Sequence, residues 1–372
     1  MIIAGEASGD LHGAALIKKL REKDPELFCE GIGGNNMIAE GFNALYHIKD
    51  MAFLGFSEVV KHLPFIKQVQ KELLQQIKKN NIKTLVLIDY PGFNLNFAKK
   101  VKKLGLKIIY YISPQIWAWG KNRIKKIKKL IDEMIVVFPF EKDFYEGYGV
   151  KVEFVGHPIV ERIDNYKFME KDKLYADYNL DKTKDILLLL PGSRKQEISR
   201  IFPECLKAAN MLCNRFNMQT VVACPGNIDE SEFDTYSDLG NFVLINNKSY
   251  DLMKYAKFGI IKSGTSTLES GLFNLPFVVV YTTSRITYMI GRLLVKIKHI
   301  AMANIILGRT VVKEFIQDEV NADNLYKNIS EIIENNDKYE KIKSDLSEIS
   351  EILGKKNASE NAAGIILSML NA

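Results

Sequence analysis

The chain has 372 residues, of which 47% are hydrophobic and 26% charged, and its formal net charge is +6. This length exceeds one ordinary hydrophobic core and suits two α/β domains, and the composition is that of a soluble globular enzyme. No apolar run approaches the roughly 18 residues of a membrane-spanning helix, and Glu6 comes too early for a secretory signal, so we expect a cytoplasmic protein. The mild positive charge suits an acidic substrate or an anionic membrane surface, whereas no recognised motif indicates nucleic acid as a partner.

The four cysteines show neither a C-x-x-C pair nor a metal-binding spacing with histidine, so we interpret them as small buried residues in a reducing compartment. No D-x-D triplet occurs, and no carboxylate and histidine cluster has metal spacing, so we expect no metal and no cofactor. The cysteines are Cys29, Cys205, Cys213 and Cys224.

Short runs rich in β-branched residues alternate with longer amphipathic stretches, which predicts parallel sheets with crossover helices. The runs are continuously apolar, as in strands that are covered on both faces. The expected strands of the first half are Ile2–Ala4, Leu27–Gly31, Thr84–Ile88, Lys107–Ile112, Met134–Phe138 and Val152–Val155. Those of the second half are Ile186–Leu190, Thr220–Ala223, Phe242–Ile245, Phe258–Ile261 and Phe277–Tyr281.

The segment Asp164–Thr183 is polar and contains no apolar strand, so we place a linker there. We therefore expect two Rossmann-like, doubly wound domains, residues 1–165 and 166–345, that face each other across a cleft. A helical, Lys- and Glu-rich segment, residues 346–372, would cross back to the first domain or to a partner subunit.

The first strand runs into Gly5-Glu6-Ala7-Ser8-Gly9-Asp10-Leu11-His12-Gly13. Its glycines would let another molecule approach the backbone, and the N-terminus of the following helix favours anions, although a purely structural turn is the alternative. A hydrolase triad of Ser8, Asp10 and His12 is a poor interpretation, because the serine is outside G-x-S-x-G and near-adjacent residues seldom reach triad geometry.

Two further strand exits in the first half carry candidate chemistry. Asp89 follows Thr84–Ile88 and could act as a general base, or it could cap a helix or hold the Pro-Gly turn that follows. In the run 113–120, Gln115 and Trp117 suit recognition of a sugar or an acyl chain, or else packing in a core or an interface.

Two stretches combine apolar and basic residues at helical spacing. The segment Lys121–Leu130 has six basic residues in ten and predicts an amphipathic helix, which is either a solvated face or a contact with anionic lipid or phosphate. The segment Phe56–Ile77 either packs on the sheet or touches a membrane, and Pro64 predicts two helices that meet there rather than one.

Two loops of the second half offer phosphate-binding groups. Gly192, Ser193 and Arg194 end one strand, and the glycine permits a tight turn while the arginine can donate two hydrogen bonds to a phosphate. The second loop presents hydroxyls and backbone N–H groups at a helix N-terminus, with Glu269 placed to accept hydrogen bonds from a ribose. Each loop alone could be an N-cap motif, but both in one domain favour nucleotide binding. The second loop comprises Ser263, Gly264, Thr265, Ser266 and Thr267.

Taken in order, the motifs resemble those of the lipid-A-disaccharide synthase family over nearly the whole chain. The matching runs are Ala4–Asp10, Asp89–Asn94, Ser113–Trp119, Val155–Pro158, Leu190–Arg194 and Ser263–Glu269. The resemblance implies a GT-B fold and an inverting transfer without a metal. The donor would be UDP-2,3-diacylglucosamine and the acceptor 2,3-diacylglucosamine 1-phosphate, giving the β-1,6-linked lipid A disaccharide 1-phosphate and UDP.

The same resemblance assigns roles to residues. Asp89 would be the general base for the acceptor 6-hydroxyl, and Arg194 and the turn 263–267 would bind the diphosphate, with Glu269 near the ribose. Residues that match a late nucleotide-facing segment are Asn304, Arg309, Glu314 and Gln317, although Ala301–Ala303 stands where the family usually has a proline. Residues expected to contact the acceptor or to shape the cleft are Glu6, Ser8, His12, Gln115, Trp117 and His157.

The resemblance further implies peripheral attachment to the inner face of the inner membrane through Phe56–Ile77 and Lys121–Leu130. It also implies a homodimer with exchanged C-terminal segments. Two other functions stay open at this point: a UDP-sugar 2-epimerase of similar fold, which would need no acceptor, and a non-catalytic UDP-sugar-binding protein at a membrane, in which Asp89 would be dispensable.

Overall fold

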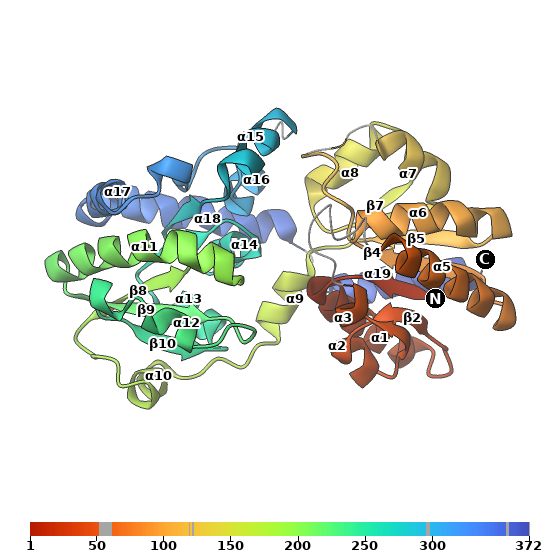
Figure 1. Ribbon diagram of the computed structural model, residues 1–372, viewed down its shortest axis with the longest axis horizontal. Coiled ribbons are helices and arrows are strands. Elements are labelled where there is room, and N and C mark those ends of the chain that lie inside the picture. The colour runs from red at the N-terminus through yellow and green to blue at the C-terminus, as the bar shows by residue number, and fades with distance from the viewer. Residues whose placement is uncertain (52–61, 119, 121–122, 295–297, 355–356, 372) are drawn as a thin grey trace. The chain divides into compact units, whose positions relative to one another are not determined.

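The computed structural model describes residues 1–372 apart from 52–61, 119, 121–122, 295–297, 355–356 and 372 (Figure 1). The chain divides into two compact units: unit 1 holds Met1–Asp164 and Leu353–Ala372, and unit 2 holds Asn165–Ile352. Each unit contains one sheet whose described strands pair in parallel, with helices connecting them. The predicted α/β class with two doubly wound sheets is therefore confirmed.

The sheet of unit 1 has seven strands in the order β3-β2-β1-β4-β5-β6-β7. Its strands are β1 (Ile2–Ala4), β2 (Glu30–Gly33), β3 (Asn43–His47), β4 (Thr84–Ile88), β5 (Lys107–Tyr111), β6 (Glu133–Val136) and β7 (Val152–Phe154). The helices described in this unit are α1 (Ala7–Lys23), α2 (Asn35–Ala39), α3 (Ile48–Met51), α5 (Leu63–Lys79), α6 (Pro91–Val101), α7 (Ile124–Leu130), α8 (Pro139–Glu146), α9 (Pro158–Asp164) and α19 (Ala358–Asn371).

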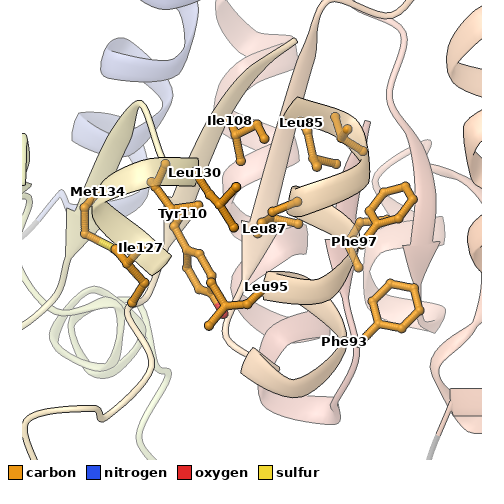
Figure 2. Close-up of a cluster of buried hydrophobic side chains, with 14 of the residues drawn as sticks. Leu85, Leu87, Phe93, Leu95, Phe97, Ile108, Tyr110, Ile127, Leu130 and Met134 are labelled. Atoms are coloured by element: carbon orange, nitrogen blue, oxygen red, sulfur yellow. The ribbon is translucent and has the colours of Figure 1, made fainter. Parts of the chain in front are cut away.

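The core of unit 1 forms where amphipathic helices cover strands that are apolar on both faces. All five residues of β4 are buried. Figure 2 shows Leu95 of α6 beside Tyr110 of β5, with Phe93 and Phe97 of α6 next to each other in the same cluster, which continues into α7. Burying a large apolar side chain stabilises a fold by roughly 1.5–3 kcal/mol, so this face of the sheet holds the α6 and α7 connections in place.

Both basic amphipathic segments had two interpretations, an ordinary packed helix or a lipid contact, and their described apolar residues largely face this core. Val69, Leu73 and Ile77 of α5 are buried, and the apolar residues of α7 are at most 6% exposed. The lysines of both helices lie on the solvent side, as in an ordinary amphipathic surface helix. Helix α5 begins at Leu63 with Pro64 in its first turn, where proline is tolerated. The part of the predicted stripe at 56–61 lies outside the described residues.

Two neighbouring strands of unit 1, β2 and the edge strand β3, differ from the prediction. Strand β2 was expected at Leu27–Gly31 but occupies Glu30–Gly33, and Phe28 is 60% exposed. Gly31 has a φ of +143° and a Cβ there would lie 2.2 Å from the Ile2 carbonyl oxygen, so glycine is required in this pairing. Strand β3 was not predicted, because it pairs only with β2 and its residues are partly exposed rather than continuously apolar.

The sheet of unit 2 has six strands in the order β10-β9-β8-β11-β12-β13. Its strands are β8 (Asp185–Leu190), β9 (Met218–Cys224), β10 (Val243–Asn246), β11 (Phe258–Lys262), β12 (Phe277–Tyr281) and β13 (Glu314–Ile316), the last of which is three residues long and was not predicted. The helices described here are α10 (Lys171–Asp177), α11 (Lys195–Arg215), α12 (Ser231–Asp234), α13 (Ser249–Tyr255), α14 (Thr265–Leu272), α15 (Arg285–Leu294), α16 (Met302–Leu307), α17 (Ala322–Glu334) and α18 (Asn336–Leu353).

The core of unit 2 has the same construction. Helices α11 and α17 pack on each other, and α11 contributes Ile201, Phe202 and Leu206 to a cluster that covers β8, β9, β11 and β12. Gly271 of α14 packs against α18, since a Cβ there would lie 2.6 Å from a side-chain carbon of Ile349.

Helix α19 belongs to unit 1 and packs along α1. The backbone N–H of Ser359 donates to Glu161 Oε2 at 2.9 Å, and the amide of Asn361 donates to the Val155 carbonyl at 3.0 Å. Lys107 Nζ donates to the carbonyl of Met369 near the end of this helix. The last helix therefore completes the first unit of its own chain.

Candidate active site

The described strands of each sheet end in loops at one common edge, and each sheet has one point where the strand order reverses. That point lies between β1 and β4 in unit 1 and between β8 and β11 in unit 2. In doubly wound folds, ligands bind at the carboxyl ends of the strands beside this switch point. The loops that follow these four strands carry Glu6, Asp89, the turn 192–194 and the turn 263–267.

At the switch point of unit 1, the first and fourth strands place two acidic residues near each other. A Cβ on Gly5 would lie 2.2 Å from a ring carbon of Tyr90, so only glycine lets the β1 exit approach the β4 exit this closely. Glu6 then begins α1 as its exposed N-cap, and Asp89 directly follows β4. The negative charge of Glu6 acts on both Asp89 and Tyr90.

Asp89 has an unusual backbone and an unusual acidity. Asp89 and Tyr90 both have positive φ, 43° and 47°. The Tyr110 hydroxyl donates to the Asp89 carbonyl at 2.5 Å, and the Asn94 amide donates to it at 2.7 Å. Burial and then the Glu6 charge raise the pKa of Asp89 to about 6. A carboxyl group with this pKa is ionised at neutral pH and is a stronger base than an ordinary aspartate.

The loop after β5 is held by a buried glutamate. Glu141 of α8 is 1% exposed, and its Oε1 accepts hydrogen bonds from Ser113 Oγ at 2.7 Å and Trp117 Nε1 at 3.1 Å. The Trp117 ring also meets Phe140 edge-on at 5.0 Å. Burial raises the pKa of Glu141 to about 7. This anchoring leaves Gln115 exposed at the tip of the loop.

Two of the predicted residues of unit 1, His12 and His157, are histidines close enough to interact electrostatically. His157 is 6% exposed, and its Nδ1 accepts a hydrogen bond from the Ile159 backbone N–H at 3.1 Å at the start of α9. Burial lowers the pKa of His157 to about 3 and that of His12 to about 4, with the Arg162 charge contributing to both. Both imidazoles are therefore neutral at physiological pH. Ser8 is exposed on the first turn of α1.

In unit 2, the turn after β8 is shaped by Glu197, three residues beyond the Arg194 N-cap of α11. Glu197 Oε2 accepts a hydrogen bond from the Ser193 backbone N–H at 3.1 Å. Gly192 has a φ of +123°, and a Cβ there would lie 2.6 Å from the same Glu197 oxygen, so this turn requires glycine. Arg194 is exposed, and its guanidinium makes no hydrogen bond or ion pair with any described residue.

The same glutamate joins this turn to the second predicted loop. Lys262, the last residue of β11, places Nζ 2.9 Å from Glu197 Oε1. Lys262 directly precedes Ser263, and the two side chains of the pair are only 20% and 17% exposed. This ion pair carries no net charge and links the two loops, so the N-termini of α11 and α14 lie at one switch point. Helix N-termini favour an anion such as a diphosphate.

Within the loop 263–269, some side chains support the backbone and others are exposed. Thr267 is fully buried; its hydroxyl donates to the Gly264 carbonyl and accepts from the Met302 backbone N–H. The Ser263 hydroxyl donates to the Ile300 carbonyl at 3.0 Å. Gly264 and Thr265 are exposed, and Ser266 is partly buried. Glu269 accepts a hydrogen bond from the Tyr250 hydroxyl at 2.9 Å.

The residues of the late predicted segment form a network with this loop. Asn304 is fully buried, and its amide donates to Glu314 Oε1 at 2.9 Å and to the Val312 carbonyl at 2.8 Å. Glu314 also accepts from the backbone N–H groups of Ile300 and Ala301 at the start of α16. Asn304 and Glu314 therefore fix the segment 300–302, whose backbone also forms hydrogen bonds with Ser263 and Thr267.

The other two residues of that segment have separate partners. The Gln317 side chain makes two hydrogen bonds with the backbone of Thr283, at 2.7 and 3.0 Å. Arg309 is paired with Asp345 and Glu348 of α18. Direct contact of Asn304, Arg309, Glu314 and Gln317 with a nucleotide stays a prediction.

Three residues at these edges escaped prediction: Glu141, Glu197 and Lys262. Glu141 and Glu197 each occupy the first turn of a helix that follows a strand, where an acidic residue is a recognisable capping signal. Lys262 could have been noticed as a charged residue at the end of an apolar strand. Among the described residues, no group of three or more His, Cys, Asp or Glu could hold a metal ion, and no helix is long and apolar enough to cross a bilayer.

Solved structures share this two-sheet architecture. The UDP-GlcNAc 2-epimerase from Neisseria meningitidis bound to UDP-GlcNAc matches with a TM-score of 0.69 at 13% identity, covering 100% of this chain and 99% of that chain. The calicheamicin glycosyltransferase CalG4 matches with a TM-score of 0.61 at 12% identity, covering 100% and 96%. The fold is thus the GT-B type, which glycosyltransferases and sugar-nucleotide epimerases share.

Sequence comparison decides between these classes. The model of the family described as lipid-A-disaccharide synthetase matches residues 1–368. The lipid-A-disaccharide synthase of Geobacter metallireducens is 40% identical over 373 aligned positions, covering 100% of this chain and 97% of that relative. The chain belongs to the lipid-A-disaccharide synthetase family and is a glycosyltransferase.

Proposed function

We propose that the chain transfers diacylglucosamine from UDP-2,3-diacylglucosamine to the 6-hydroxyl of 2,3-diacylglucosamine 1-phosphate. Its products are the β-1,6-linked disaccharide 1-phosphate and UDP. Membership of the family supports the choice of substrates. The structural observation that carries the proposal is Asp89, a carboxylate at the switch point of unit 1 whose pKa is raised to about 6.

In the proposed reaction, the acceptor 6-oxygen attacks the anomeric carbon of the donor from the side opposite the diphosphate. The new C–O bond forms as the bond from the anomeric carbon to the diphosphate breaks, so the configuration inverts from α to β. The hydroxyl proton passes to the Asp89 carboxylate, which is ionised at neutral pH and basic enough to accept it.

Unit 2 is proposed to bind the departing UDP. The helix N-termini that follow the turns 192–194 and 263–264 direct partial positive charge at the diphosphate. The exposed guanidinium of Arg194 can donate two parallel hydrogen bonds to one phosphate. These groups are proposed to offset the charge of UDP without a metal ion, so activity is expected to persist in EDTA.

The experiment that tests this function measures UDP release by the purified chain from the acylated donor, with and without the acceptor. Release that depends on the acceptor, together with the disaccharide mass in mass spectrometry, supports the transferase. Conversion of the donor to an epimer without an acceptor would instead indicate a 2-epimerase. Donor binding without turnover would indicate a binding protein.

The finer expectations about location and assembly belong to the same proposal. We place the chain in the cytoplasm, peripherally on the inner face of the inner membrane, and the positive net charge of the chain favours an anionic surface. A homodimer with exchanged C-terminal segments would form the α1–α19 contacts between two chains. Lys23 and Glu360, 3.3 Å apart between their charged atoms, offer a test: cysteines at both positions would crosslink two chains only if the segments exchange.

A further inference from the structure

Helix α15 carries the two most exposed large hydrophobic side chains among the described residues. Ile286 is 73% exposed and Met289 is 66% exposed. Residues three apart on a helix lie on the same face, so these two side chains form one apolar surface. Single exposed apolar residues are common on soluble proteins, whereas a contiguous apolar surface of neighbouring large side chains is characteristic of an interaction site.

The two side chains are exposed because α15 is a well-formed helix that packs little against the rest of unit 2. The Ser284 hydroxyl accepts from the Thr287 backbone N–H at 3.2 Å, and the Tyr288 N–H donates to the Ser284 carbonyl at 2.9 Å, so the N-terminus of α15 is well capped. None of the α15 residues whose burial is described is buried, and no described helix or strand packs extensively against it. Figure 1 shows α15 at the margin of its unit.

The exposed apolar residues distinguish α15 from the amphipathic helices of unit 1. Helices α5 and α7 direct their described apolar residues largely into the core of unit 1 and present lysines to solvent. Helix α15 presents apolar residues to solvent instead. Neither water nor the described part of unit 2 gives these side chains an apolar environment. A binding partner of α15 is therefore expected to have an apolar surface.

The charge around α15 indicates what kind of partner this is. No Asp or Glu occurs in the chain between Glu269 and Glu314. Arg285 and Arg292 are exposed, and neither forms a salt bridge with a carboxylate of any described residue. Arg292 lies beside Tyr288, with 3.4 Å between its Nη1 and the tyrosine hydroxyl. Exposed apolar residues flanked by arginine and tyrosine are typical of a helix at a lipid–water interface.

We propose that α15 binds the surface of an anionic lipid bilayer, with Ile286 and Met289 in the acyl region and Arg285 and Arg292 at the lipid phosphates. The assignment rests on the proposed transferase function, whose substrates carry acyl chains. It adds a helix of unit 2 to the segments of unit 1 that were considered as apolar contacts with lipid.

The test uses the full chain and vesicles of equal parts phosphatidylglycerol and phosphatidylethanolamine, with binding measured by co-sedimentation. The double variant Ile286→Ser/Met289→Ser is expected to bind about 10-fold or more weakly, because it removes the apolar surface. The variant Arg285→Gln/Arg292→Gln is expected to lose roughly 10-fold as well and to show a weaker dependence on salt.

The matched control is Phe28→Ser, which removes a side chain of similar exposure, 60%, from unit 1 and is expected to leave binding unchanged. All these side chains are exposed, so the variants should fold normally, which circular dichroism and thermal unfolding check. Parental binding by Ile286→Ser/Met289→Ser overturns the proposal.

Two other outcomes would also overturn it. Unchanged vesicle binding with loss of a dimer in ultracentrifugation would make this face a contact between copies of the chain. Unchanged vesicle binding with a raised KM for detergent-dispersed substrates would make it a site for a substrate acyl chain. Absence of acceptor-dependent UDP release in the parental chain would contradict the transferase function, whereas the vesicle comparison would still decide the role of α15.

Discussion

Lys262 and Glu197 form a partly buried ion pair that connects the two loops at the switch point of unit 2, with 2.9 Å between Nζ and Oε1. The second oxygen of Glu197 accepts a hydrogen bond from the backbone of Ser193. One carboxylate thus holds the glycine turn of the first loop against the strand that leads into the second. The geometry of the proposed diphosphate site depends on this link.

Replacing Glu197 should therefore disturb both stability and nucleotide binding. Glu197→Ala leaves the Ser193 N–H and the Lys262 ammonium without their acceptor, a loss on the order of 1–3 kcal/mol. We expect a lower melting temperature by a few degrees and UDP affinity about 10-fold weaker, measured by thermal unfolding and calorimetry. The control is Glu232→Ala, which breaks a more exposed pair with Lys195 near the same turn and should change little. Equal effects in the two variants would count against the link.

Arg194 should contribute directly to UDP binding. Its guanidinium is exposed and engaged by no described residue, so Arg194→Ala should leave the melting temperature nearly unchanged while weakening UDP binding about 10- to 100-fold. Arg200→Ala, which removes an exposed arginine from the same helix, is the control. Unchanged UDP affinity in Arg194→Ala would remove this residue from the proposed site.

Asp89 is expected to be needed for catalysis and to lower the stability of the fold at neutral pH. Asp89→Asn is expected to lower kcat by roughly 10²–10⁴ while UDP binding is kept. The folded-state pKa of Asp89, about 6, lies above its usual value of 3.8, so the stability it contributes is present below about pH 4 and is lost as the pH rises through 6. Asp89→Asn should therefore raise the melting temperature at pH 7 more than at pH 4. A kcat close to that of the parental chain in Asp89→Asn would rule out Asp89 as the general base.

The same pKa predicts the pH profile of the enzyme. The activity of the parental chain should fall about tenfold per pH unit below pH 6, as the base becomes protonated. Glu6→Gln removes a charge that raises the pKa of Asp89, so this acid limb should move to lower pH by a fraction of a unit, since burial is the larger cause. Glu22→Gln, at the exposed far end of α1, should leave the limb in place.

Glu141 should act as a positioning residue for the loop 113–117. Glu141→Ala leaves the Ser113 hydroxyl and the Trp117 indole without their acceptor, so we expect a raised acceptor KM, a change in tryptophan fluorescence and a loss of roughly 2–4 kcal/mol of stability. Glu141→Gln keeps an acceptor oxygen and should recover most of the KM.

The pH dependence of the free energy of unfolding distinguishes the positioning role of Glu141 from a general loss of packing. The pKa of Glu141, raised from 4.5 to about 7, means that its stabilising contribution is lost as the pH rises through 7. Glu141→Gln should flatten that decline. A decline of the same slope in Glu141→Gln would show that Glu141 does not titrate in this range.

Much of the fold followed from local pattern. Runs such as Thr84–Ile88 are continuously apolar because both faces of a parallel strand are covered, and this property is visible without a structure. The strands that escaped prediction, β3 and β13, lie at sheet edges and are partly exposed or only three residues long. Edge strands bury less, so their sequences carry a weaker signal.

The sequence motifs also marked the strand ends at the switch point of each sheet. A glycine next to a strand exit, as at Gly5 or Gly192, marks a backbone position with no room for a side chain, and such positions concentrate at switch points. Chain order alone therefore located Asp89 and the turns 192–194 and 263–267.

What only the tertiary structure decided is which partner each side chain meets. The periodicity of α5 and α7 shows that each has an apolar face, but only packing reveals that their described apolar residues largely face a core. The exposure of Ile286 and Met289 of α15 likewise became visible only in the structure. In the same way, the acceptors of Lys262, Trp117 and Asn304 lie 10 to 65 residues away in the chain. Spacing fixes neighbours within one helix or strand, whereas these contacts arise only when separate elements pack together.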